Sequence, residues 1–421
     1  MESRKPIYFL RMNPWGWKRA SLPKLKASLQ KIVSENSPDR ERCLAMTWSQ
    51  RNRYLNASIL QRQERCWEEE TGVKPGDSYF TLIVPIYNEE NSLPSFLGTL
   101  MLSDVPSTVN MQVIFVSNAC TDMSVDILRA FLSGLGNVET RDVVGEFTDQ
   151  SMDRCCAVVE RDHFTCIHIN TSTAGKANAL RIGNTLAYRS GHLITMSIDA
   201  NNFIEPDAIR IMFSHAHRAF RGKPESHDTV LYSGVGRESV KGSKGEGLLA
   251  KISTNRRHLV EAGGAGEGGV GGAMVAWNTK WMNDLEGPPQ VALEDYAMGV
   301  LARINNFKIE LAEGANIWVY IVNDFRGLLN TRARHVRGKR QLCDYVNHDQ
   351  SIVSFIENEA YYMKKFRLRL KHLFDRIVDD PLSVVRYTAT FLLWEWAIWK
   401  AMRDYKRDPK NQSWEKISST Y

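Results

Sequence analysis

From residue 80 onward the chain alternates short apolar runs with segments of helical spacing, and this alternation limits the fold more than any other feature. The apolar runs are continuous rather than interrupted at every second residue, as expected of strands buried on both faces of a sheet. Such alternation predicts an α/β fold with a mostly parallel central sheet flanked by helices. The predicted strands are 80–87, 111–117, 164–170, 192–199 and 229–236. The predicted helices are 91–102, 124–134, 175–190, 206–220 and 293–307.

Two regions flank this alternating part. Residues 1–77 are polar and basic with helical spacing, and they end in the breaker Lys-Pro-Gly-Asp at 74–77. We therefore predict a helical N-terminal extension over 1–77 and the α/β domain over 78–325. An Arg-rich segment and C-terminal helices are predicted over 326–421.

Composition excludes several classes of protein. A net charge of +6 on 421 residues does not indicate a nucleic-acid binder. The seven cysteines are scattered without a CxxC pair, which favours a reducing compartment over a disulfide framework or zinc finger. The N-terminus has no apolar core of a secretory signal. We therefore expect a cytoplasmic protein.

No run of about 18 uninterrupted apolar residues occurs, so no transmembrane helix is predicted. The segment 384–402 comes nearest, and it contains Trp394, Trp396 and Trp399. Two interpretations remain open. The segment is either a helix packed on the core or a helix lying in a membrane interface, where Trp and Lys favour the headgroup level. The second would give peripheral membrane contact.

The predicted strand at 192–199 ends in a carboxylate, Asp199, with Asn201 two residues later. In open α/β sheets ligands bind beyond the carboxyl ends of the strands. Oxygen ligands there suit Mg²⁺ or Mn²⁺, which bind one or two carboxylates together with phosphate oxygens. Asp and Asn are also common in strand-end turns and caps that have no role in binding. These two residues alone leave both interpretations open.

Two further segments reach the same edge. The run VPIYNEE (84–90) would place polar and aromatic groups where a base or ribose could stack or hydrogen-bond, unless Asn88 only caps the next helix. Its candidate residues are Pro85, Tyr87, Asn88 and Glu89. Lys176 and Asn178 open the helix 175–190, and the backbone N–H groups and dipole of a helix N-terminus favour anions.

Charged residues near the end of the domain supply the remaining candidates. Glu294 and Asp295 open a helix, either because acidic residues suit its dipole or because one of them is a general base. In TRARHVRGKRQ (331–341), Arg334 and Arg337 belong either to a solvated basic face or to a phosphate clamp.

In chain order, several segments resemble the inverting, nucleotide-sugar-dependent glycosyltransferases of family 2, which have the GT-A fold. The segments are VPIYNEE, SNACTD, GKANALRIG, SIDANN, GGAMVAW, LEDYAMGVLARINNFKIELAEG and RARHVRG. The resemblance covers about residues 80–340. It implies transfer of a sugar from a nucleoside-diphosphate sugar, a UDP-sugar first among them, to an acceptor hydroxyl, with Mn²⁺ or Mg²⁺. Because the processive members carry several transmembrane helices, we expect a non-processive enzyme with an acceptor that the sequence does not specify.

The resemblance also implies roles for individual residues. Asp295 matches the family's catalytic general base, and it directly follows Glu294. Asp199 matches the first metal ligand, and Asn201 replaces the usual second Asp. Asn118 stands where the family often has an acidic residue that hydrogen-bonds to the nucleobase of the donor. Arg334 and Arg337 fall in the family's Arg-rich motif, and His335 stands where Trp is common and could instead approach the metal.

Two other functions remain open at this stage. The substitutions at Asn118 and Asn201 would suit a catalytically impaired relative that binds a sugar nucleotide. A nucleotidyltransferase shares a similar sheet and also binds Mg²⁺, but it would normally have a Gly-rich, basic loop after the first strand. VPIYNEE lacks such a loop.

Overall fold

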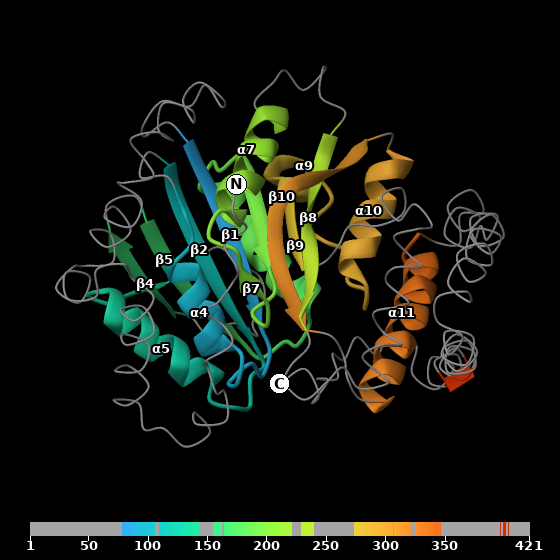
Figure 1. Ribbon diagram of the computed structural model, residues 1–421, viewed down its shortest axis with the longest axis horizontal. Helices are drawn as coiled ribbons and strands as arrows, with labels where there is room; N and C mark the ends of the chain where they lie inside the picture. Colours follow the sequence, from blue (N-terminus) through green and yellow to red (C-terminus); the bar gives the residue numbers. More distant parts are fainter. Residues whose placement is uncertain are drawn as a thin grey trace, which may run out of the picture.

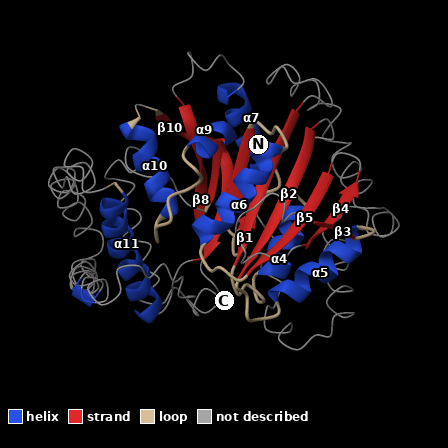
Figure 2. Cartoon of the chain, turned by 180° about the vertical axis from the view of Figure 1, so that it is seen from behind, coloured by secondary structure: helices blue, strands red, loops and turns tan. Residues whose placement is uncertain are grey.

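The computed structural model describes residues 78–105, 109–142, 155–161, 164–220, 229–239, 273–305, 307–320 and 325–346, with 396, 399, 400 and 403. Within these ranges the chain is a mixed α/β fold in which one large sheet has helices on both faces (Figures 1 and 2). The predicted fold class is confirmed. The N-terminal extension and most of the C-terminal helices, including 384–402, fall outside the described residues, so the proposed domain boundaries stay predictions.

The sheet has ten strands in the order β3-β4-β5-β2-β1-β6-β9-β8-β10-β7. The strands are β1 (Ser78–Ile86), β2 (Val109–Asn118), β3 (Glu139–Asp142), β4 (Cys155–Arg161), β5 (Phe164–Thr171), β6 (Ile194–Ile198), β7 (Phe203–Ile204), β8 (Thr229–Ser239), β9 (Met274–Asn278) and β10 (Lys308–Tyr320). The helices are α4 (Leu93–Met101), α5 (Ser124–Leu135), α6 (Lys176–Arg189), α7 (Ala208–Phe220), α9 (Thr279–Asp284), α10 (Glu294–Ile304) and α11 (Phe325–Tyr345).

The middle of the sheet is parallel, as predicted: β5, β2, β1 and β6 pair with one another in that orientation. The sheet as a whole is more mixed than the apolar runs indicated. Strand β9 lies antiparallel between β6 and β8, and β3, β4 and β7 add antiparallel pairs toward the two edges. The short polar β3, with the sequence ETRD, has no apolar run that could have predicted it.

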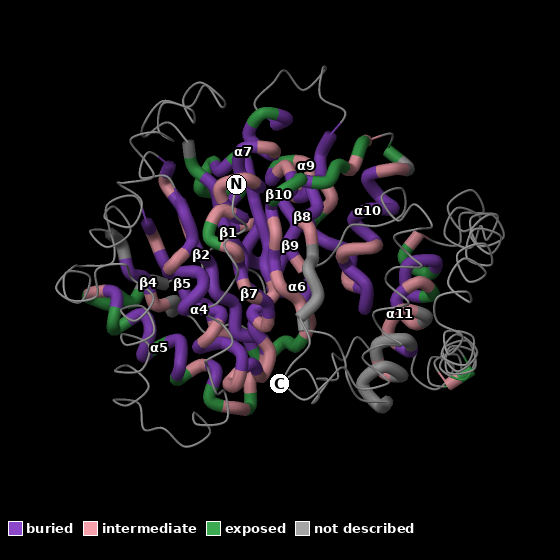
Figure 3. Tube along the Cα trace, viewed as in Figure 1, coloured by how far each residue is buried: buried purple, intermediate pink, exposed green. Residues whose placement is uncertain are grey.

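Strand β1 is apolar throughout because both of its faces are covered. Leu82 and Val84 face a core formed with α4, α5 and α7, whereas Ile83 faces a second core formed with α6, α9 and α10. Figure 3 shows the central strands buried along most of their length. Continuous apolar strands are the expected result of such double burial.

The register brings the carboxyl ends of the parallel strands to one edge. Ile86 pairs with Ser117, Asn118 pairs with Thr171, and Ile83 pairs with Ser197 close to the end of β6. The loops that follow β1, β2, β5 and β6 therefore lie together, as the ligand-binding edge of such a sheet requires. Among the described residues no helix is both long and apolar enough to cross a membrane.

Candidate active site

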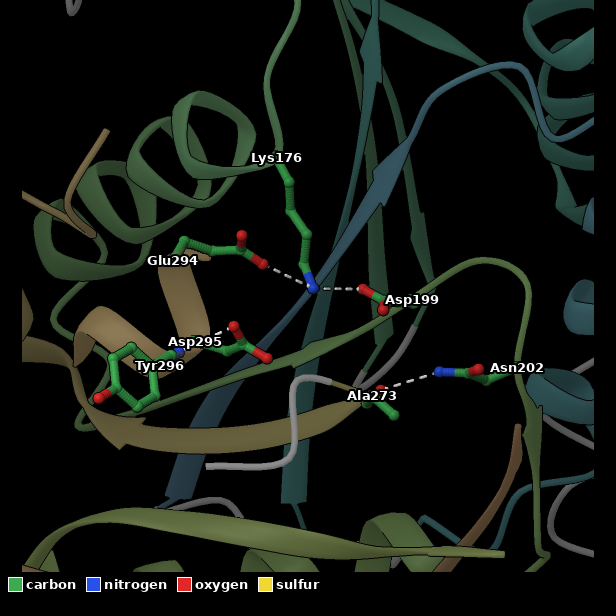
Figure 4. Close-up of polar contacts among 7 residues, drawn as sticks. All are labelled: Lys176, Asp199, Asn202, Ala273, Glu294, Asp295 and Tyr296. Atoms are coloured by element: carbon green, nitrogen blue, oxygen red, sulfur yellow. Dashed lines mark hydrogen bonds and ion pairs between the residues drawn. The ribbon is translucent and has the colours of Figure 1, made fainter. Parts of the chain in front are cut away.

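A buried lysine joins the end of the central strand β6 to the start of α10. The ammonium of Lys176, the first residue of α6, lies 2.7 Å from Asp199 Oδ1 and 2.9 Å from Glu294 Oε1 (Figure 4). The side chains of Lys176 and Glu294 are each only 8% exposed. Asp199, just after β6, and the Glu294–Asp295 pair are thus brought to one place although they are far apart in sequence.

The electrostatics of this cluster keep Lys176 charged despite its burial. Burial acts to lower the pKa of Lys176, but the carboxylates of Asp199 and Glu294 raise that pKa above its ordinary value. Lys176 is therefore a cation at neutral pH. Burial raises the pKa of Asp199 above its ordinary value, and the neighbouring Lys176 ammonium opposes that shift.

Asp295 is the half-buried second acid at the start of α10. Its Oδ1 accepts a hydrogen bond of 2.8 Å from the backbone N–H of Tyr296, and Figure 4 shows its carboxyl group on the side of Asp199. Burial, followed by the charge of Glu294, raises the pKa of Asp295 from 3.8 to about 6. A carboxylate with a pKa this close to neutrality is suited to accept a proton.

The turn after β6 fixes the position of Asp199. The backbone N–H of Asp199 donates to the carbonyl oxygen of Ala273 (3.3 Å), and the N–H of Asn202 donates to Asp199 O (3.1 Å). The side-chain amide of Asn202 also donates to Ala273 O, at 3.0 Å. The strand-end turn therefore also positions the candidate site residue Asp199. The role of Asn202 was not predicted, because its hydrogen-bond partner is distant in the sequence.

The residues near Asp199 fit a divalent cation that also has ligands from a substrate. No group of three or more His, Cys, Asp or Glu side chains in the described part of the chain could hold a metal by itself. Lys176 contacts Oδ1 of the Asp199 carboxylate, and the half-buried Asn201 follows two positions later. One carboxylate, an amide oxygen and phosphate oxygens are an appropriate set for Mg²⁺ or Mn²⁺. His335 lies half-buried on α11.

Helix α11 brings the Arg-rich segment to the start of α10. Gln341 accepts a hydrogen bond of 2.8 Å from the backbone N–H of Ala292, and the Lys339 ammonium lies 5.4 Å from the centre of the Tyr296 ring. The charge of Arg334 lowers the pKa of both Asp199 and Asp295 against the effect of burial, so its guanidinium belongs to the same electrostatic cluster. Arg337 lies half-buried one turn later on this helix.

The loops after β1 and β2 are joined by hydrogen bonds. Asn88, with φ of 55°, accepts a bond of 2.7 Å from the backbone N–H of Thr121 through Oδ1. The N–H of Glu89 donates to Ser124 Oγ (2.7 Å), and its carboxylate accepts a bond from Ser92. Pro85 lies buried within β1, and Tyr87 is half-buried at its end. All four predicted residues thus occur at the expected edge, with Asn88 and Glu89 engaged in holding the loops.

Asn118 and Asn178 lie on either side of the loop that precedes Lys176. Asn118 is fully buried at the end of β2. With its side-chain amide turned so that oxygen and nitrogen both face suitable partners, the nitrogen donates to the carbonyl oxygens of Thr173 and Gly175, both at 3.3 Å. Asn178 is buried in the first turn of α6. Its Oδ1 accepts a bond from Arg181, while its Nδ2 has no partner within the described ranges. Asn118 therefore supports the loop that leads into Lys176.

No family model and no curated protein sequence matches the chain. Among solved structures, it is similar to the mannosyltransferase PcManGT of Pyrobaculum calidifontis in complex with GDP-Man and Mn²⁺, with 16% identity, a TM-score of 0.48, and coverage of 92% of this chain and 100% of the other. It is also similar to S. aureus TarS 1–349 in complex with UDP (12% identity, TM-score 0.39, 81% and 95% covered). A third is glucosyl-3-phosphoglycerate synthase of Mycobacterium tuberculosis with Mn²⁺ and UDP (15%, 0.39, 66% and 83%). We infer the function from the chain's own residues.

Proposed function

We propose that the chain is a non-processive, inverting glycosyltransferase of the family 2 type, which moves a sugar from a nucleoside-diphosphate sugar to an acceptor hydroxyl. The observation that carries this proposal is the bridge from Asp199 through Lys176 to Glu294. The bridge holds Asp199, a potential ligand for the metal that binds the diphosphate, beside the acidic pair Glu294 and Asp295. Of this pair, Asp295 has a pKa near neutrality. The sequence resemblance gives the same two positions these roles.

In the proposed reaction Asp295 is the general base. The acceptor oxygen forms a bond to the anomeric carbon as the bond from that carbon to the diphosphate oxygen breaks. The hydroxyl proton passes to the Asp295 carboxylate, and the nucleoside diphosphate leaves. General-base help of this kind contributes roughly 10²–10⁴-fold. With a pKa of about 6, Asp295 is mostly ionised at neutral pH and can accept the proton.

The diphosphate would lie between the turn after β6 and α11. Asp199 and Asn201, with His335 as a further candidate, would hold Mn²⁺ or Mg²⁺. When bound, that cation neutralises charge on the leaving diphosphate. Arg334 and Arg337 on α11 would contribute positive charge to the same group.

The nucleoside would lie over the ends of β1 and β2, beside the loops joined through Asn88. The half-buried Tyr87, rather than the buried Pro85, offers a surface for a base or ribose, and Glu89 and Asn178 would offer polar groups there. The amide of Asn118 is engaged with backbone carbonyls, so the choice of base, for which we propose uracil first, depends on other groups at this edge.

The variant Asp295→Asn tests the proposal. It keeps the size of the side chain but removes the base, so we expect transfer to fall at least 10²-fold while binding of the nucleotide sugar stays within a few-fold. A panel of nucleotide sugars with Mn²⁺ identifies the donor by thermal shift, since a ligand at 100 times its Kd stabilises by about 2.7 kcal/mol. The exposed Asp284→Asn on α9 is the matched control. Near-normal transfer by Asp295→Asn would reject the proposed base.

A catalytically impaired relative is the second candidate, favoured by Asn201 at the position of the usual second metal-binding Asp. The two candidates differ in their chemistry. A transferase should release free nucleoside diphosphate slowly when given its donor and Mn²⁺ without acceptor, whereas an impaired relative should bind the donor and release none.

We further propose that the segment 384–402 contacts a membrane interface. Of its described residues, Trp396 and Trp399 are exposed, at 45% and 57%, and the guanidinium of Arg403 lies 5.1 Å from the centre of the Trp399 ring. Aromatic and basic side chains together suit the headgroup region. The double variant Trp396→Ala/Trp399→Ala should lose co-sedimentation with anionic liposomes. Equal binding by the variant and the unchanged chain would remove this proposal.

A further inference from the structure

We propose that Lys176 is a positioning residue whose ammonium fixes the first turn of α10 against the end of β6, and that Glu294 serves as its anchor rather than as a second base. This inference rests on the proposed transfer reaction, in which Asp199 and Asp295 must keep a fixed separation. The position of Lys176 at a helix N-terminus indicates binding of the substrate diphosphate. The inference assigns Lys176 a positioning role instead.

The geometry supports this assignment because three separate elements meet at one atom. Lys176 Nζ belongs to α6, Asp199 follows β6 and Glu294 opens α10. Both contacts are within 3 Å, and the Lys176 and Glu294 side chains are almost completely removed from solvent. Helix α10 makes more of its contacts with β10 and β8 than with β6, so this bridge is a direct connection between its first turn and the strand end that carries Asp199.

The charges make the lysine necessary. Without its ammonium, the carboxylates of Asp199 and Glu294 would both lose the cation that lies within 3 Å of each, and breaking a buried ion pair on one side is strongly destabilising. With it, one positive charge serves two negative ones. An ammonium held at bonding distance by two carboxylates has little net attraction left for a phosphate.

The same geometry separates the roles of the two adjacent acids. Glu294 directs its carboxylate to Lys176, whereas Asp295 has one oxygen on the backbone N–H of Tyr296 and its carboxyl group on the side of Asp199 (Figure 4). Anchoring of Glu294 therefore sets the direction in which the next residue points. A change in the anchor should reduce turnover through Asp295 without removing a group that contacts the donor.

A double-mutant cycle tests the inference on the full chain. The variants are Lys176→Met, Glu294→Gln and the two combined, and the measurements are the Tm without ligand, kcat and KM for transfer, and the Kd of UDP and of GDP with Mn²⁺. Lys176→Met should lower Tm by on the order of 5 °C or more, because it leaves two buried carboxylates unpaired. The double variant should be at least as stable as Lys176→Met, because Glu294→Gln removes one of those charges.

The kinetic pattern distinguishes positioning from diphosphate binding. Lys176→Met and Glu294→Gln should each lower kcat at least tenfold, with the Kd of the bound nucleotide changed less than about threefold. Lys280→Met, which breaks an exposed ion pair with Asp284 on α9, is the matched control and should change neither quantity. Additive losses of Tm, or a Kd raised tenfold or more in Lys176→Met with kcat retained, would overturn the inference.

The two remaining cases are also decisive. If Lys176→Met does not fold, recovery of folded protein in the double variant supports the bridge, and absence of recovery counts against it. If the unchanged chain binds neither nucleotide and transfers no sugar, the proposed function fails, whereas the ligand-free Tm cycle still decides whether Lys176 and Glu294 act together.

Discussion

Gly338 of α11 lies directly against Leu293, the residue before the acidic pair. A Cβ atom placed on Gly338 would come within 2.6 Å of Leu293 Cγ and 2.9 Å of the Leu293 backbone nitrogen. The helix that carries Arg334 can approach the start of α10 this closely only because position 338 has no side chain. The distance between the Arg-rich helix and the candidate base is therefore set by a glycine that has no part in the proposed reaction.

We expect Gly338→Ala to impair activity from this position. The added methyl group meets backbone as well as side chain, so α11 must shift, at a cost of about 1–3 kcal/mol. The shift would move Arg334 relative to Asp295 and lower kcat severalfold or more. Thermal unfolding and steady-state transfer measure the two effects. Tyr345→Ala, at the exposed end of the same helix, should leave both almost unchanged; equal activity of Gly338→Ala and the unchanged chain would contradict the prediction.

Transfer should decline as the pH falls through about 6, because protonation of Asp295 removes the base. Below that pH the rate should fall about tenfold per pH unit while a single group controls it. A pH profile of kcat on the unchanged chain measures this limb. A rate that stays constant down to pH 5 would show that a different group accepts the proton.

The buried carboxylate of Asp295 should also lower the free energy of unfolding at neutral pH. The pKa of Asp295 is raised from 3.8 to about 6 in the folded chain, so the folded state holds the proton more tightly than the unfolded state. The cost of ionisation is present in full above pH 6 and disappears as the pH falls from about 6 toward 4. Asp295→Asn should therefore be more stable than the unchanged chain at pH 7.5, by on the order of 1–2 kcal/mol, and the difference should vanish near pH 4. Chemical denaturation at several pH values measures it; a destabilised Asp295→Asn at pH 7.5 would contradict the electrostatic account.

Asn201→Asp should tighten metal binding. The half-buried Asn201 follows Asp199 in the same turn, and a second carboxylate there adds a negative charge to the oxygen ligands. We expect the Mn²⁺ concentration for half-maximal activity to fall roughly three- to tenfold. Titration of Mn²⁺ after treatment with a chelator measures this. Asn137→Asp, at an exposed position between α5 and β3, is the control for a general effect of charge.

Asn88→Ala should destabilise the two loops at the proposed nucleotide-binding edge of the sheet. The substitution places alanine at a φ of 55° and removes the acceptor for the Thr121 N–H, with an expected cost of about 2 kcal/mol. Asn88→Asp keeps an acceptor oxygen and should be nearly neutral. Asn88→Gly relieves only the backbone strain and should fall between the two. Thermal melts rank the three variants, and any other order would show that this hydrogen bond does not hold the loops together.

The sequence was sufficient to predict that the candidate residues lie together at one edge of the sheet. Continuous apolar strands identified β1, β2, β5 and β6, and their parallel pairing brings Asp199 to the same edge as Tyr87 and Asn118. The partners of individual side chains could not be predicted this way. Periodicity specifies the direction of a residue within its own element, whereas the contact of Lys176 with Glu294 depends on how α6 and α10 pack across the sheet.

Other features left no pattern in the sequence. The contact of Gly338 with Leu293 requires the packing of two helices, and a single glycine in a basic helical segment does not indicate such an approach. The amide of Asn118 is identified as a loop support only when the carbonyls of Thr173 and Gly175 are in place. The antiparallel position of β9 between β6 and β8 likewise follows from chain topology rather than from its apolar composition.

The hydrogen bonds between the loops after β1 and β2 have a consequence for how this protein could be altered. Asn88 with Thr121, and Glu89 with Ser124, form one hydrogen-bonded unit, whereas the first turn of α10 is held by the ion pair of Glu294 with Lys176. An engineer could therefore exchange the two loops together to change which nucleotide is accepted, while the proton-accepting end of the molecule keeps its own supports.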